Sequence, residues 1–147
     1  MEIRHAEPAD HARVAGVIDD WWGGRRMRDM LPRLFFTHFR DTSFVADDGA
    51  GLAGFLCGFL SQNYPDQPYV HFVGVAPERR KSGLASELYE RFFEAARSAR
   101  RTSVHCVTSP GNTGSLAFHR RIGFEIEAEV EGYDGSGEIR VLLRRAL

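Results

Sequence analysis

The sequence predicts a single α+β domain (mixed α/β) over residues 1–147, with helices flanking a central, mostly antiparallel sheet. The length of 147 residues lies within the range of one domain, and 43% of the residues are hydrophobic, which is enough for a core. No repeat or low-complexity linker interrupts the chain. Short extended runs precede a helical stretch and return after it, so we expect about six to seven strands and about four helices.

The N-terminal part predicts a short strand over residues 2–6, followed by two helices. The first helix covers residues 8–20, because Pro suits a first helical turn and apolar residues recur at helical spacing at Val14, Val17, Ile18 and Trp21. The run WWGGRR then breaks the pattern. A second helix is expected over residues 29–39, with an apolar face formed by Leu31, Leu34, Phe35 and His38 or Phe39.

From residue 42 onward the pattern changes to short extended runs. The runs TSFVAD, LAGFLCGFLS and YVHFVGV predict a three-strand antiparallel meander. Residues 83–97 predict an amphipathic helix with an apolar face of Leu84, Leu88, Phe92 and Ala95 or Ala96. The run TSVHCVTS predicts a further strand, the run PGNTGSLAFHRRIGF a loop and a helix, and residues 124–144 a closing hairpin around YDGSGE.

Charge and cysteine usage exclude several classes of function. The net charge of −1 and the pI near 6.6 provide no global basic field, so we expect neither nucleic acid nor a membrane as a partner. Cys57 and Cys106 each lie alone in an apolar run, which favours buried thiols in a reducing compartment. The N-terminus lacks a signal pattern, and the longest apolar run is too short to span a bilayer, so we expect a cytoplasmic protein.

Several familiar motifs fail on their context. Gly49, Gly51 and Gly54 spell the dinucleotide pattern Gly-x-Gly-x-x-Gly, but an apolar, strand-like run follows them instead of a helix, and a hairpin turn explains the glycines more simply. The run RRKS lacks the glycines of a phosphate-binding Walker loop, and no Gly-x-Ser-x-Gly elbow is present. The six histidines show no paired ligand spacing, so we predict no metal.

The stretch VAPERRKSGLA combines the end of a strand, three consecutive cations, a glycine and the start of a helix. The backbone N–H groups of a first helical turn have no helical partner, and the helix dipole adds positive potential, so this arrangement can cradle an anion. A solvated basic turn ahead of a helix is the alternative, and spacing alone does not separate the two interpretations.

Two motifs resemble those of the GNAT (Gcn5-related N-acetyltransferase) superfamily. Arg80-x-x-Gly83-x-Ala85 after a strand is similar to the family's acetyl-CoA signature, and NTGSLAFHRRIGF is similar to its later Asn-to-Gly-Phe motif. The resemblance implies a sheet whose fourth and fifth strands splay apart around the cofactor, with acetyl-CoA as the acyl donor. It implies an N-acetyltransferase acting on a primary amine of a small molecule or peptide by direct attack in a ternary complex. A homodimer is common in the family.

The resemblance also assigns the cofactor contacts. Amides of the basic turn and first helical turn would bind the pyrophosphate, the fourth strand would hold the pantetheine arm, and Asn112 and Ser115 would contact the cofactor. The Val75 amide would stabilise the developing oxyanion. The implied cofactor-binding residues are Val73, Val75, Arg80, Lys81, Ser82, Gly83, Leu84, Ala85, Asn112 and Ser115.

The acid and base are less defined, because His119 occupies the position where the family often carries Tyr. Imidazole can protonate a leaving thiolate near neutral pH; Tyr89 or Tyr133 is the alternative acid, or His119 only packs on its helix. His71 in the fourth strand is the expected base if its face, shared by alternation with Val73 and Val75, meets the acetyl group; otherwise it is structural.

The acceptor site is expected in the first helical region. Trp21 and Trp22 can wall an apolar or aromatic pocket, and Arg25 and Arg26 can bind an acidic group on the substrate. Alternatively, Trp21 belongs to the core and the arginines to solvent. Two further functions stay open: a non-catalytic acyl-CoA-binding sensor of the same fold, and an anion-binding interaction domain unrelated to CoA.

Overall fold

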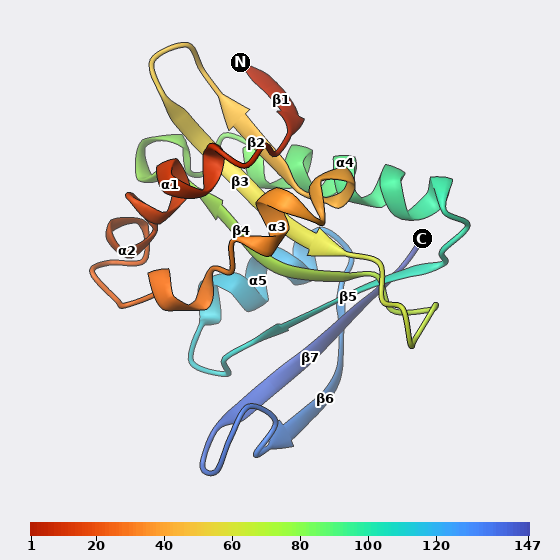
Figure 1. The fold of residues 1–147 in the computed structure, drawn as a ribbon. Coiled ribbons are helices and arrows are strands. Elements are labelled where there is room, and N and C mark those ends of the chain that lie inside the picture. The colour runs from red at the N-terminus through yellow and green to blue at the C-terminus, as the bar shows by residue number, and fades with distance from the viewer. The chain divides into compact units, whose positions relative to one another are not determined.

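In the computed structural model, which describes residues 1–147, seven strands alternate with five α-helices and three 3-10 turns (Figure 1). The contacts divide the chain into two units, Met1–Phe59 with Val70–Ala95, and Leu60–Tyr69 with Ala96–Leu147. The predicted α+β class and the number of strands are confirmed. The single domain over residues 1–147 stays a prediction. None of the helices has the length and apolar character needed to cross a membrane.

The first unit contains a sheet with the strand order β1-β2-β3-β4. β1 pairs antiparallel with β2, and β2 with β3, where the register shifts beside Asp47. The elements are β1 (Glu2–His5), α1 (Asp10–Ala15), α2 (Ile18–Trp21), η1 (Arg28–Met30), α3 (Leu34–Thr37), η2 (Arg40–Thr42), β2 (Phe44–Asp47), β3 (Leu52–Phe59), β4 (Tyr69–Val75), η3 (Pro77–Arg79) and α4 (Leu84–Ser98), whose end belongs to the second unit.

Helices cover both faces of this sheet. On one face, α1 to α3 pack over β2–β4 (Figure 1). Buried apolar side chains of these helices and strands form a core cluster that includes Phe36, Val45 and Phe55, each fully buried. On the other face, Leu84 and Leu88 of α4 lie next to Gly54. The predicted helix over residues 83–97 is therefore confirmed almost to the residue, because its apolar stripe faces a sheet along its length.

The predicted helices over residues 8–20 and 29–39 are wrong in their continuity. The first divides into α1 and α2, with a break at Gly16 and Val17. The second is reduced to η1 and α3, separated by Leu31, which has φ −108° and ψ 87°. Leu31 precedes Pro32, and the proline ring disfavours helical geometry in the residue before it. Leu34, placed on the apolar face by periodicity, is 40% exposed.

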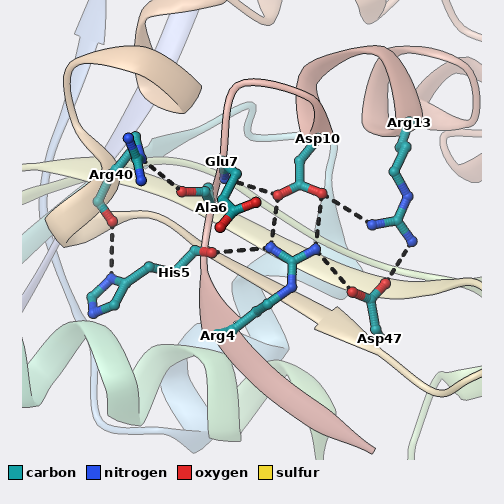
Figure 2. A network of polar contacts seen from close by, with 8 residues as sticks. All are labelled: Arg4, His5, Ala6, Glu7, Asp10, Arg13, Arg40 and Asp47. Carbon is teal, nitrogen blue, oxygen red and sulfur yellow. Dashed lines mark hydrogen bonds and ion pairs between the residues drawn. The ribbon is translucent and has the colours of Figure 1, made fainter.

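A network of ion pairs fixes the N-terminal strand to the sheet and to α1 (Figure 2). The Asp10 carboxylate, whose side chain is 3% exposed, accepts hydrogen bonds from both terminal nitrogens of Arg4, from Arg13 and from the Glu7 amide. Arg4 and Arg13 also bind Asp47 at the end of β2. Burial raises the pKa of Asp10, but these hydrogen bonds outweigh burial and lower it below its ordinary value.

The second unit contains β5 (Ser103–Thr108), α5 (Thr113–Arg121), β6 (Glu125–Glu131) and β7 (Ile139–Ala146). Its strands have the order β5-β7-β6, and both pairings are antiparallel. The predicted closing hairpin is confirmed as β6 and β7. Val104 and Leu143, both fully buried, belong to the core of this unit.

Candidate functional site

The loop between β4 and α4 has the backbone of an anion cradle. Lys81 has φ 62° and Gly83 has φ 86°, so two of three consecutive residues are left-handed. A non-glycine residue in this region is uncommon and marks a backbone that its surroundings hold in place. Turns of this kind gather successive N–H groups around a concavity that attracts anions. A Cβ on Gly83 would meet nothing within 4 Å, so the approach to the loop is open.

Side chains of the first unit hold this loop in shape. Arg79 of η3 donates to the Asp48 carboxylate in the turn between β2 and β3, and the Ser82 hydroxyl donates to the Arg79 carbonyl oxygen. Asp48 also accepts from the amides of Ala50 and Gly51. The Ala50 amide and Arg79 lower the pKa of Asp48. These contacts fix the shape of the loop.

The first turn of α4 continues the cradle. Leu84 is 2% exposed and anchors the turn beneath the sheet, whereas Ala85 is half-buried and Arg80 is exposed. The Glu87 amide donates to the Gly83 carbonyl oxygen and so closes the first helical turn. The amides before Glu87 precede the first complete turn and have no acceptor within the helix. They can donate to a ligand.

β4 carries the expected base and the expected oxyanion amide. Val73 and Val75 are half-buried, and Gly74 between them is buried. His71 Nε2 donates to the Met30 carbonyl oxygen at 2.7 Å, so the neutral ring keeps its lone pair on Nδ1. The ring stacks on Phe35 with centroids 5.1 Å apart.

His71 and Phe72, which the expected alternation along β4 puts on opposite faces, both contact residues of the helical layer. Phe72 meets Trp22 edge-on at 5.6 Å, on the face covered by α1 to α3. His71 contacts Phe35 and Met30 in that same helical layer. His71 therefore contacts the helical layer that also carries the acceptor segment.

The segment between α2 and η1, residues 22–27, is a rigid loop that we call the acceptor segment. Gly23 has φ 70° and Gly24 has φ 88°, and the Asp19 carboxylate accepts from the amides of Met27 and Arg28 at 2.8 Å each. Arg25 and Arg26 are exposed, and Arg26 lies 3.7 Å from Asp29.

The two tryptophans have different environments. Trp21 is 9% exposed and belongs to the core cluster, as the alternative interpretation of the sequence had it. Trp22 is half-buried and packs at the margin of that cluster, against Phe72 and Gly74. Of the two tryptophans, only Trp22 is exposed enough to contact an acceptor substrate.

The second unit carries the other expected cofactor residues on α5. The Asn112 side-chain oxygen accepts from the Ser115 amide at 3.1 Å and caps the helix, which leaves its NH2 group to donate. The Ser115 hydroxyl accepts from Thr108 at the end of β5 at 3.4 Å.

His119 is buried on α5, between the rings of Phe118 and Phe124. Its Nδ1 donates to the Ser115 carbonyl oxygen at 2.7 Å, so Nε2 carries the lone pair in the neutral ring. Burial lowers the pKa of His119, only partly opposed by the bond to Ser115. Proton donation from Nε2 requires the imidazolium, which this environment disfavours. Of the alternative acids, Tyr89 is buried and Tyr133 is 45% exposed.

Within the first unit, the structure brings the cradle and the acceptor segment together. Arg80 donates to the Trp21 carbonyl oxygen, and Trp22 lies on Gly74, the residue before Val75. Sequence reasoning missed Asp19, Asp48 and Gly74. An Asp ahead of a Gly pair, and one ahead of Gly-Ala-Gly, are turn signals that could have pointed to the first two.

Comparisons with known proteins identify the family of the chain. The profile of the acetyltransferase (GNAT) family matches residues 11–124. The L-2,4-diaminobutyric acid acetyltransferase of Chromohalobacter salexigens is 27% identical over 136 residues, which cover 84% of this chain and 71% of that protein. The chain spans only 48% and 60% of two further relatives of the same name, from Shouchella clausii and Halomonas elongata.

Solved structures share the fold along the whole chain. A GNAT-family protein from Desulfovibrio desulfuricans superposes with a TM-score of 0.85 at 21% identity, covering 99% of this chain and 98% of that one. A Salmonella typhimurium structure that contains its cofactor acetyl-CoA gives a TM-score of 0.75 at 19% identity, covering 100% and 94% of the two chains.

The fold and the cradle define an acyl-CoA-dependent transferase. The chain belongs to the acetyltransferase (GNAT) family, whose members transfer the acetyl group of acetyl-CoA to an amine. Acetyl-CoA is therefore the acyl donor.

Proposed function

We propose that this chain acetylates a primary amine of a small molecule that also carries a carboxylate. The observation that carries the proposal is the acceptor segment: Arg25 and Arg26 are exposed on a loop that Asp19 holds rigid, beside Trp22. Arginine matches a carboxylate in a bidentate fork, and a rigid loop reduces the entropy lost on binding. Relatives named for L-2,4-diaminobutyric acid, an amine that carries a carboxylate, support the same class. A peptide N-terminus is the second candidate acceptor.

On the donor side, we propose that the amides from Lys81 to Ala85 and the side chain of Arg80 bind the pyrophosphate, with Lys81, Ser82, Gly83 and Leu84 contributing backbone more than side chain. The Arg80 amide itself donates to the Pro77 carbonyl oxygen. The left-handed residues in this loop and the unpaired first-turn amides of α4 support this role. The backbone of Val73 and Val75 holds the pantetheine arm. Asn112 donates its NH2 group to the cofactor, and the Ser115 amide keeps Asn112 in place by donating to its side-chain oxygen.

For the chemistry, we propose direct attack of the amine nitrogen on the thioester carbonyl carbon. A C–N bond forms, the Val75 amide stabilises the oxyanion, and the C–S bond then breaks to release the CoA thiolate. His71 accepts the amine proton on Nδ1, since its Nε2 hydrogen is engaged by the Met30 carbonyl oxygen. The thiolate takes a proton from a donor whose identity stays a prediction: His119 is one candidate, and water or Tyr133 is the other.

The test is a release assay for free CoA thiol with a panel of amines that differ in charge. We expect turnover with amino-acid-like amines and a tenfold or larger rise in the acceptor KM for Arg25→Gln with Arg26→Gln, at unchanged acetyl-CoA affinity. Equal turnover of acceptors with and without a carboxylate would overturn the acceptor class. Acetyl-CoA binding without turnover of any amine would favour a sensor module. The predicted homodimer requires a separate measurement of mass in solution.

A further inference from the structure

Arg80, which opens the cofactor signature, makes a contact that pyrophosphate binding does not require. Its Nη2 donates to the Trp21 carbonyl oxygen at 2.5 Å, although the two residues are 59 positions apart in the chain. Trp21 is the last residue of α2. The final carbonyls of a helix have no partner within the helix and carry the negative end of its dipole. Arg80 therefore caps the C-terminus of α2, the helix that leads into the acceptor segment.

A second contact, between Trp22 and the backbone of β4, holds the acceptor segment next to the Arg80 hydrogen bond. An added Cβ on Gly74 would lie 2.8 Å from Cη2 and 2.9 Å from Cζ3 of Trp22, so the indole rests directly on the backbone of β4. Phe72 also meets the indole edge-on, with 5.6 Å between the ring centroids. The start of the acceptor segment is thus held at two points. One is the guanidinium of the cradle, and the other is the strand that ends at Val75.

We propose that Arg80 is a positioning residue that couples acetyl-CoA binding to the conformation of the acceptor segment. This inference rests on the proposed function. A guanidinium has five N–H donors in a fixed fork, and the Trp21 carbonyl engages Nη2. A pyrophosphate bound on the adjacent amides takes the remaining donors, so Arg80 bridges the anion and the end of α2. The bridge restrains Arg80, and through the Trp21 carbonyl it fixes the position of the acceptor segment when the cofactor is bound.

The coupling must be reciprocal, because a change in the affinity of one site caused by the other is a shared free energy. Bound acetyl-CoA raises the affinity for the acceptor by the same factor as bound acceptor raises the affinity for acetyl-CoA. Couplings of this kind amount to roughly 5- to 150-fold, and a single charged hydrogen bond belongs near the lower limit, at about five- to tenfold.

The chain contains a built-in reporter for this coupling. It has two tryptophans, Trp21 and Trp22, and both lie at the contact. The experiment is a titration of the full chain with acetyl-CoA, followed by tryptophan emission excited at the red edge of indole absorption, where adenine does not absorb. A parallel calorimetric titration measures binding itself. In the wild type, we expect a saturable change in tryptophan emission whose midpoint equals the midpoint of the calorimetric titration.

Arg80→Met removes the bridge and keeps the length of the aliphatic stem. We expect it to bind acetyl-CoA more weakly and to show no emission change at saturation, whereas Arg80→Lys restores part of the change. Arg91→Met, which removes an exposed cation from α4, is the matched control and should behave as wild type. With an acceptor from the panel, the factor by which acetyl-CoA tightens acceptor binding should fall to near one in Arg80→Met.

The outcomes separate the two proposals. Folded wild type that releases no heat with acetyl-CoA would overturn the cofactor site and the proposed function. Wild type that binds acetyl-CoA without an emission change would overturn the coupling alone. An emission change that survives in Arg80→Met at saturation would also overturn it, because the signal would then reach the tryptophans by another route.

Discussion

The packing of the Trp22 indole on Gly74 can be used to test whether this contact positions the acceptor segment. In Gly74→Ala, the new Cβ would lie 2.6 Å from Cε1 of Phe55 and 2.8–2.9 Å from two atoms of Trp22. Carbon atoms in contact are normally about 3.5–4.0 Å apart, so a separation of about 1 Å must be made. Both rings must give way, and Trp22, half-buried at the margin of the core, has more room to move than the fully buried Phe55.

The energetic cost follows from overpacking, which destabilises a protein by about 1–3 kcal/mol. With a urea slope of about 2 kcal/mol per molar, a cost of about 2 kcal/mol lowers the unfolding midpoint by about 1 M. Displacement of Trp22 should also raise the acceptor KM more than it changes the dissociation constant of acetyl-CoA. Urea unfolding, native tryptophan emission and steady-state kinetics measure these three effects on one preparation.

Gly54→Ala is the matched control for Gly74→Ala. Its Cβ would lie 3.1 Å from the Gly74 carbonyl oxygen and 3.2 Å from the terminal carbons of Leu84 and Leu88, on the face covered by α4. We expect some loss of stability and a native Trp22 environment. If Gly74→Ala changed stability by less than about 0.5 kcal/mol and left the emission native, the packing on Gly74 would not restrain Trp22 and the reasoning would be refuted.

Three further predictions concern charge and backbone. First, the hydrogen bonds of Arg13 and Arg4 lower the pKa of Asp47, and the pKa of Asp10 is lowered as well. The folded state therefore binds fewer protons than the unfolded chain near pH 4. Their stabilisation is complete above about pH 4 and is lost as the pH falls further, so the urea midpoint should drop there, and less steeply in Asp10→Asn. Second, because burial lowers the pKa of His119, its ring is neutral at pH 7, and we expect kcat not to fall as the pH rises from about 6.5 to 8. Third, Lys81→Gly removes a left-handed non-glycine residue and should raise the free energy of unfolding by about 0.5–1 kcal/mol, measured in urea, with acetyl-CoA affinity retained.

Each of these has a contradicting result. A urea midpoint that stayed level below pH 4 would mean that the ion-pair network contributes no pH-dependent stability. A kcat that fell with an apparent pKa below 6.5, and no longer did so in His119→Asn, would establish His119 as the acid. A less stable Lys81→Gly would show that the lysine side chain contributes more than its backbone geometry costs.

The parts of the fold that the sequence predicted well are those with a local physical cause. The helix at residues 83–97 has an apolar stripe against one sheet, and the run of strands between residues 42 and 75 has clear turn residues between its members. The prediction of a continuous helix over residues 29–39 was wrong because it followed the apolar periodicity and ignored Pro32. The effect of Pro32 on the backbone of Leu31 is equally local and could have been used.

The candidate site was predictable only where it is carried by contiguous residues. The loop from Arg80 to Ala85 could be selected as a candidate because the donors of an anion cradle are backbone amides within one short loop. The contact of Arg80 with the Trp21 carbonyl oxygen joins residues 59 positions apart and leaves no periodic signal. The tautomer of His71 likewise depends on the Met30 carbonyl oxygen, which any residue at that position would supply.

The way Asp19 organises the acceptor segment has a consequence for redesign. The shape of that loop depends on the Asp19 carboxylate, two left-handed glycines and backbone hydrogen bonds, including one from the Gly24 amide to the Asp19 carbonyl oxygen. None of these contacts uses the side chain of Arg25 or Arg26. The two side chains can therefore be substituted without changing the conformation of the loop. Pairs such as Glu-Glu or Gln-Tyr at these positions should redirect the enzyme to cationic or neutral amines.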